Sequence, residues 1–225
     1  MVNILAPYAH LVGVGDPTSI FTKEDGIYCL RRIEYFGRVS HRSEDSQTEG
    51  SWERFIRTVV LGHGDFSIIE HASVTVDMMV DRGITHELVR HRLFSFTQAS
   101  TRFINYSKKC PPEFIIPPGI DGGKGSPWTA AIDQCEASYK DLIARGYAPQ
   151  IARSVFPNAL ASRIIVTGNL RNWRHLLLMR TTKETHPQFR QVSIPLLQEF
   201  QEKIPILFED IEPLAKQSDN LKKMR

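Results

Sequence analysis

Few cysteines, little net charge and no long apolar run mark this 225-residue sequence. The three cysteines, Cys29, Cys110 and Cys135, are odd in number and lack a C-x-x-C spacing, which argues against a disulfide framework and a thiolate zinc site. No stretch approaches the roughly 20 apolar residues of a membrane-spanning helix, and the first residues lack the pattern of an export signal. We therefore expect a soluble, cytoplasmic protein in a reducing setting, without a membrane partner.

Several familiar site patterns are also missing. The Gly13-Val14-Gly15 turn has no third glycine in register and is soon followed by proline, so the dinucleotide-binding fingerprint is absent. The histidines show neither H-x-x-x-H nor H-E-x-x-H spacing, and we expect no metal site. Neither Ser95 nor Ser100 lies in a G-x-S-x-G elbow, which argues against a serine nucleophile.

The charge and composition describe an ordinary globular chain. Lys and Arg number 28 against 25 Asp and Glu, for a formal charge of +3, so any preference for anions must come from local clustering. General affinity for nucleic acid is not indicated. Hydrophobic residues make up 41% and charged residues 24%, and the length fits one domain over residues 1–225.

The spacing of apolar residues predicts both helices and strands. Helical spacing is clear in the segment with Ile27, Leu30 and Ile33, and alternation is clear in Val74-Thr75-Val76. Ser126 followed by Pro127 is typical of a helix start. The predicted helices cover 23–39, 48–62, 83–92, 126–145, a short segment from 149, 171–180 and 187–208, the last interrupted near Pro195 and Pro205. The predicted strands lie within 2–14, 66–80 and 159–167, and 110–125 is predicted as a loop.

A dense polar cluster runs from Arg90 to Arg102, where three arginines, a histidine, a glutamine and four hydroxyls fall within thirteen positions. Guanidinium groups bind phosphate oxygens through paired hydrogen bonds, while hydroxyls and amides bind other polar edges of a ligand. The alternative is a solvated basic helix followed by a polar loop. Interleaved apolar residues favour a segment fixed to a core: Leu93, Phe94, Phe96 and Phe103. We therefore predict a site for a phosphorylated small molecule.

A second polar group comprises Arg153, Asn169, Arg171, His175 and Arg180. Asn169 and Arg180 differ by eleven positions, about three helical turns, and could contact one extended ligand. Structural explanations also apply. Asn169 could cap the helix, and Arg180 near the helix C-terminus is favoured by the macrodipole.

Arg90-His91-Arg92, followed by seven residues, Ser100 and then Arg102, resembles the signature of the flavin-dependent thymidylate synthases. The segments Gly62-His63 and Ser67-Ile68-Ile69-Glu70-His71 are similar to that family's second marker. Asn169-Leu170-Arg171 with Arg180 is similar to the third. The resemblance implies an α/β (α+β) fold with a central, mostly antiparallel sheet, flanking helices and a flavin site that is not a Rossmann fold. It also implies a homotetramer whose active sites are shared between subunits.

The reaction implied by the resemblance is the conversion of dUMP to dTMP. The one-carbon unit would come from 5,10-methylenetetrahydrofolate and the reducing equivalents from NADPH through FAD, with no metal and no covalent protein nucleophile. Arg180 resembles the residue that stabilises the anionic pyrimidine. The implied FAD contacts are Ser67, Arg90, His91, Arg92, Gln98, Asn169, Leu170, Arg171 and His175, with His63 and His186 as further candidates near the flavin or adenine. The implied dUMP contacts are Glu87, Leu88, Val89, Arg90, Gln98, Ala99, Ser100, Thr101, Arg102, Arg153 and Arg180.

Some positions depart from the family's commonest pattern. Glu87 stands where some relatives have glutamine, Gln98 where some have glutamate and Phe103 where tyrosine is frequent. His175 stands where asparagine occurs, and Asp65 where many members carry histidine.

Two other functions remain open at this point. One is a flavoprotein of the same fold that acts on another pyrimidine nucleotide, because fold alone does not fix function. The other is a basic nucleic-acid-binding module that uses Arg90, Arg92, Arg102 and Lys108-Lys109.

Overall fold

The computed structural model describes residues 2–108 and 110–223; Lys109, which the nucleic-acid hypothesis included, lies outside them. The chain divides into two compact units, each made of several segments. Unit 1 comprises the residues up to Tyr8, Met78–Arg90 and Phe96–Ile165. Unit 2 comprises Ala9–Asp77, His91–Ser95 and the residues from Val166 onward. That the chain forms one domain stays a prediction.

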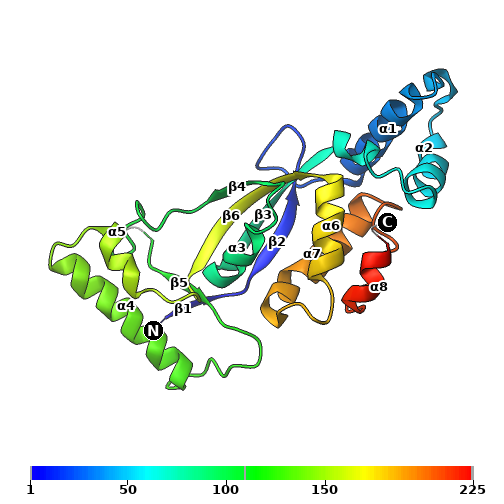
Figure 1. Ribbon diagram of the computed structural model, residues 1–225. Coiled ribbons are helices and arrows are strands. Elements are labelled where there is room, and N and C mark those ends of the chain that lie inside the picture. The colour runs from blue at the N-terminus through cyan, green and yellow to red at the C-terminus, as the bar shows by residue number, and fades with distance from the viewer. Residues whose placement is uncertain (1, 109, 224–225) are drawn as a thin grey trace. The chain divides into compact units, whose positions relative to one another are not determined.

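The described part of the chain contains both strands and helices (Figure 1). The strands are β1 (Asn3–Leu5), β2 (Tyr8–Val12), β3 (Ser73–Asp81), β4 (Ser95–Gln98), β5 (Glu113–Ile115) and β6 (Ala161–Asn169). The helices are α1 (Lys23–Val39), α2 (Ser51–Phe55), α3 (Arg82–Leu88), α4 (Pro127–Ala144), α5 (Pro149–Ala152), α6 (Leu170–Arg180), α7 (Pro187–Lys203) and α8 (Gln217–Lys222). A π-helical segment, Ile56–Gly62, continues α2.

The predicted fold class is confirmed. Four strands form an antiparallel sheet in the order β2-β3-β6-β4, and helices flank it. This sheet differs from the parallel, doubly wound sheet of Rossmann folds. β1 and β5 form a separate parallel pair in which Asn3 lies opposite Glu113 and Leu5 opposite Ile115.

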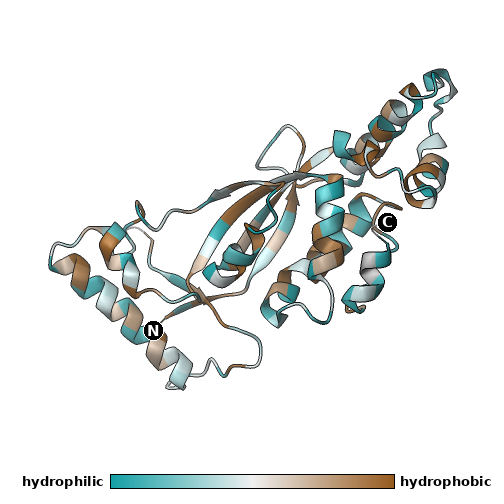
Figure 2. Cartoon of the chain, in the orientation of Figure 1, coloured by the Kyte–Doolittle hydropathy of each residue, from teal (hydrophilic) through white to brown (hydrophobic). Residues whose placement is uncertain are grey.

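In unit 2, α1 begins with a capping box. The side chain of Thr22 accepts a hydrogen bond from the backbone N–H of Asp25, and the Asp25 carboxylate accepts one from the backbone N–H of Thr22. The buried side of α1 includes Leu30 and Ile33, and α1 packs against α2 and α7. Figure 2 shows hydrophobic and hydrophilic residues mixed along this helix, as expected for an amphipathic surface helix.

In unit 1, α4 and α5 pack against each other (Figure 1). Ser126 caps α4 by accepting from the Thr129 N–H at 3.2 Å, and Pro127 occupies the first helical turn, as predicted. Beneath the helix, Phe114 and Leu160 are fully buried. Tyr139 and Phe156 stack nearby, with ring centres 4.4 Å apart and nearly parallel planes.

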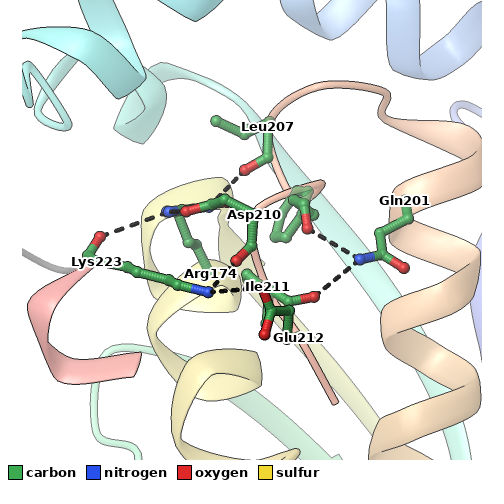
Figure 3. A network of polar contacts seen from close by, with 8 residues as sticks. Arg174, Gln201, Leu207, Asp210, Ile211, Glu212 and Lys223 are labelled. Atoms are coloured by element: carbon green, nitrogen blue, oxygen red, sulfur yellow. Dashed lines mark hydrogen bonds and ion pairs between the residues drawn. The ribbon is translucent and has the colours of Figure 1, made fainter. Parts of the chain in front are cut away.

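A polar network fixes α6 to the segment after α7, also within unit 2 (Figure 3). The Arg174 side chain is 4% exposed, and its Nη1 donates to Asp210 Oδ1 and to Leu207 O, each at 2.6 Å. Its second terminal nitrogen donates to the other carboxylate oxygen, and the guanidinium lies 5.3 Å from the centre of the Phe66 ring. Gln201 donates to two main-chain carbonyls of the same segment, Phe208 O and Ile211 O, both at 3.1 Å.

Three predicted boundaries were wrong. The helix predicted over 83–92 ends at Leu88, because the following residues enter a turn and then strand β4, which pairs with β6. The predicted loop 110–125 contains β5, which pairs with β1. The final helix runs through Pro195 without interruption and ends at Lys203, before Pro205.

Within the stretches that the structure covers, no helix combines the length and apolar character that crossing a membrane would require.

Candidate active site

The residues predicted to contact ligands divide between the two units. Unit 1 holds Glu87, Leu88, Val89, Arg90, Gln98, Ala99, Ser100, Thr101, Arg102 and Arg153. Unit 2 holds Ser67, His91, Arg92, Asn169, Leu170, Arg171, His175 and Arg180, together with His63 and His186. The predicted nucleotide contacts therefore lie in unit 1 except for Arg180. The predicted flavin contacts lie in unit 2 except for Arg90 and Gln98.

In unit 1, Gln98 is the last residue of β4 and joins two other elements. Its side-chain Nε2 donates to Thr85 Oγ1 of α3 at 3.2 Å and to Ser162 Oγ of β6 at 3.0 Å. The backbone N–H of Ala99 donates to Arg163 O at 2.9 Å and fixes the end of β4 against β6. Gln98 is therefore held by its backbone neighbours and by its side chain.

The turn after β4 carries the predicted contacts Ser100, Thr101 and Arg102, and Arg153 binds to it. Arg153 Nη1 donates to Thr101 Oγ1 at 2.9 Å, and the Thr101 side chain is buried. Ser100 Oγ accepts from the Arg102 N–H at 3.2 Å, so its hydroxyl proton remains available to a ligand. The result is a group of guanidinium and hydroxyl donors on a fixed turn, which suits a phosphate.

The predicted nucleotide contacts at the end of α3 differ in exposure. The Leu88 side chain is fully buried, so any ligand contact of Leu88 would come from its backbone. Val89 and Arg90 are exposed at the end of the helix. α3 ends at Leu88, so the helix predicted over 83–92 does not reach His91.

Not all of the apolar residues between Arg90 and Phe103 anchor the segment as predicted. Leu93 is 77% exposed and Phe103 is 80% exposed, with the Arg102 guanidinium 5.5 Å from the Phe103 ring centre. Phe94 does anchor it, since its ring packs edge-on against Trp173 of α6 at 4.8 Å. The alternative of a solvated basic segment is thus correct for the exposed side chains of Arg90, Arg92 and Arg102, but not for the backbone that carries them.

Gly168, near the end of β6, makes room for Phe94. A Cβ at this position would lie 2.3 Å from Phe94 Cδ1, far inside van der Waals contact. Asn172 of α6 adds a hydrogen bond of 2.7 Å from Nδ2 to Leu93 O. The segment 91–95 is therefore attached to α6 by ring packing and by a side-chain hydrogen bond.

At the start of α6, Asn169 is the N-cap, with its Oδ1 accepting from the Asn172 N–H at 2.9 Å. The capping role considered for Asn169 is confirmed. Leu170 is fully buried, and its N–H donates to Ala72 O at 2.9 Å.

Arg171 forms an ion pair with Glu70 at 2.5 Å. Both of these side chains are exposed, so the pair adds little stability and its guanidinium can exchange partners.

At the other end of α6, Arg180 Nε donates to His91 Nε2 at 3.0 Å. Its guanidinium lies 5.2 Å from the Phe189 ring centre, and its carbonyl accepts from Ser193 Oγ at 2.6 Å. Burial, followed by the nearby Arg180 charge and His175, lowers the pKa of His91 from 6.5 to about 4. Burial also lowers the pKa of His175, whose ring centre lies 6.2 Å from that of His91. At neutral pH His91 is therefore an uncharged acceptor beside a permanent cation.

Unit 2 also contains a pocket of about 610 Å³ that sequence reasoning largely missed. Its lining carries hydroxyl, imidazole, guanidinium and carboxylate groups: Arg38, Ser40, His41, Arg54, His63 and Asp65. Arg38 is neutralised by Glu34, whose buried carboxylate lies 2.7 Å away. Of these residues only His63 and Asp65 fell in a predicted marker. The dense run Ser40-His41-Arg42-Ser43 was the available signal.

The chain is similar to a known protein family and to curated relatives. A family model described as "Thymidylate synthase complementing protein" matches residues 28–206. A flavin-dependent thymidylate synthase of Mycobacterium sp. (strain KMS) is 35% identical over 212 residues, covering 81% of each chain. One from Mycolicibacterium vanbaalenii is 34% identical over 214 residues, covering 85% of this chain and 82% of the relative.

A solved structure with the same fold is the UMP/dUMP methylase PolB from Streptomyces cacaoi, bound with 5-Br dUMP. It has a TM-score of 0.72 and 23% sequence identity, and covers 92% of this chain and 96% of its own. The family match and the curated relatives together show that this chain belongs to the flavin-dependent thymidylate synthase family and is an enzyme of that kind.

Proposed function

We propose that the protein catalyses the reductive methylation of dUMP to dTMP. In this proposal 5,10-methylenetetrahydrofolate donates the carbon and NADPH provides the reducing equivalents. FAD is the flavin, and a homotetramer with shared sites is the active assembly. The observation that carries the proposal is the turn after β4, where Arg153, Thr101 and Ser100 offer guanidinium and hydroxyl donors beside the fixed amide of Gln98. The curated relatives named as flavin-dependent thymidylate synthases supply the reaction.

The residues of unit 2 fit a flavin dinucleotide. Arg92 and Arg171 are exposed cations that suit a pyrophosphate, and Ser67 is an exposed hydroxyl. The proposal assigns the flavin to these residues with Asn169 and His175. When bound, FAD supplies the hydride chemistry that no protein side chain can provide.

The chain's own contribution is charge and position. Arg102 and Arg153 would bind the phosphate of dUMP, and Ser100 and Gln98 would bind its other polar groups. Arg180 would stabilise the negative charge that develops on the pyrimidine when its C5 becomes nucleophilic. Because His91 is neutral and accepts from Arg180 Nε, it orients the guanidinium without reducing its charge. A covalent serine is not required, so Ser100 acts as a binding hydroxyl.

The central test is the purified protein's absorption spectrum and activity. The protein should be yellow, oxidise NADPH in a dUMP-dependent manner and form dTMP when the folate is added. Arg180→Ala should lower kcat about 10²–10³-fold, the usual effect of removing one charge-stabilising donor. Arg145→Ala is the matched control, because Arg145, the C-cap of α4, forms an exposed ion pair with Asp141. Near wild-type turnover in Arg180→Ala, with flavin still bound, would show that the assigned role is wrong.

Methylation of UMP is the second candidate, because the solved structure of the same fold is named a UMP/dUMP methylase. Parallel assays with dUMP and UMP separate the two. A nucleic-acid-binding module has no comparable support. It would require binding that weakens steeply with salt and no bound flavin.

A further inference from the structure

The side chain of Gln98 is held in one orientation by two buried hydroxyls of unit 1. Thr85 is fully buried and Ser162 is 4% exposed, and both accept from Gln98 Nε2. Thr85 belongs to α3 and Ser162 to β6, so two different elements hold the side chain at the end of β4. The amide is therefore fixed at its nitrogen end.

The proton count at Thr85 decides which end of the amide faces inward. The Thr85 hydroxyl has one proton, and it is donated to the backbone carbonyl of Arg82 at 3.0 Å. Toward Gln98, Thr85 can therefore only accept, so the group opposite it must be the –NH₂. A flipped amide would put two acceptors 3.2 Å apart, and so would a glutamate at this position.

The oxygen of the amide is the part that remains for a ligand. Both Nε2 protons are used by Thr85 and Ser162, which leaves Oε1 as an acceptor. Among the described residues Oε1 has no hydrogen-bond partner. It is not one of the buried polar atoms that lack a partner, so solvent or a ligand can reach it. An acceptor held in this way requires a donor from its ligand.

We infer that Thr85 and Ser162 are positioning residues that hold Gln98 Oε1 as a fixed acceptor for a donor group of the nucleotide. This inference rests on the proposed function, since the nucleotide is dUMP in that proposal. Two groups of dUMP have the required chemistry, the 3′-hydroxyl and the pyrimidine N3–H. The site thereby selects nucleotides that carry the donor and disfavours analogues that lack it, because a fixed acceptor without a partner is costly.

The test compares the holoenzyme's affinity for dUMP with its affinity for 3′-deoxy-dUMP and N3-methyl-dUMP. In the wild type, one analogue should bind about tenfold more weakly than dUMP, the factor for one hydrogen bond of about 1.4 kcal/mol. In Thr85→Val the dUMP affinity should fall by a similar factor. The penalty for that analogue should also disappear, because the amide is free to rotate. Ser162→Ala should give a smaller change of the same kind, and Thr85→Ser should restore the wild-type pattern.

Stability is separated from positioning by Thr129→Val. Thr129 is a buried threonine of unit 1 whose hydroxyl also donates to backbone carbonyls, but it does not contact Gln98. Its variant should lose stability as Thr85→Val does and keep the full analogue penalty. The inference is overturned if neither analogue is penalised in the wild type, or if the penalty is unchanged in both Thr85→Val and Ser162→Ala. Failure of the wild type to bind flavin or dUMP would instead overturn the proposed function, and this inference with it.

Discussion

Removing the carboxylate of Asp210 should destabilise the protein more than the loss of any surface ion pair. Asp210→Ala leaves the Arg174 guanidinium in place, with a side chain only 4% exposed and its anion gone. Breaking a buried pair from one side costs about 3–5 kcal/mol. The Asp210 side chain is 36% exposed, and Arg174 keeps its bond to Leu207 O, so water and the carbonyl offset part of that cost. We expect a loss of about 2 kcal/mol, or roughly 4–8 °C in Tm for a chain of this length.

Thermal unfolding followed by circular dichroism at one protein concentration is the assay. Asp141→Ala is the control, because its partner Arg145 is exposed and such pairs contribute at most about 1 kcal/mol. Arg174→Met should lose less than Asp210→Ala, since it removes the buried charge and keeps an apolar side chain against Phe66. If Asp210→Ala lowers Tm no more than Asp141→Ala, the reasoning about the buried charge is refuted.

Three further predictions concern pH and packing. Because the folded pKa of His91 is about 4 against an ordinary 6.5, the wild type should lose stability as pH falls through that window. In His91→Gln that loss should shrink by about 1 kcal/mol between pH 7 and 5, after discounting for solvent screening, as measured by urea unfolding. Burial raises the pKa of Glu199, which favours its protonated form in the folded state. The stability that this group contributes is therefore lost as the pH rises above the ordinary pKa of 4.5. Glu199→Gln keeps an acceptor for the Leu11 N–H. The Tm of this variant minus the Tm of the wild type should therefore be more positive at pH 7 than at pH 4, and an equal difference at both pH values would contradict this. Gly168→Ala should displace Phe94 and cost about 1–3 kcal/mol, with weaker flavin retention in a desalting assay; an unchanged Tm would show that the ring moves freely.

The long helices could be predicted from the sequence because their signals are local. The helix at 23–39 was predicted with its observed bounds, from apolar residues at helical spacing. The start of α4 follows from Ser126 and Pro127. The strand at 161–169 was placed to within about two residues at each end, since an apolar, β-branched run ends at Gly168-Asn169.

The short strands could not be predicted in this way, since pairing partners far along the chain determine them. β5 has only three residues and forms against β1, about a hundred positions earlier. β4 had a usable signal in the alternation of Phe94 and Phe96, but the preceding Arg90-His91-Arg92 run was assigned to a helix. The arginines and hydroxyls of unit 1 were identified by type and resemblance. The two hydroxyls that hold Gln98 lie in the predicted helix 83–92 and the predicted strand 159–167, and they carry no motif. Exposure of Leu93 and Phe103 was missed because hydrophobicity alone does not fix burial.

The interleaving of the two units limits how the protein can be dissected. The backbone passes from one unit to the other five times, at Tyr8, Asp77, Arg90, Ser95 and Ile165. Neither unit is therefore a contiguous stretch that a gene fragment could encode, and a truncation meant to isolate one would remove strands from both. The shortest of these segments, His91–Ser95, gives a sharper consequence. Deleting or inserting a single residue there would shift the attachment of Phe94 and the start of β4 together, so length in this stretch should be far less tolerant of change than side-chain identity at its exposed positions.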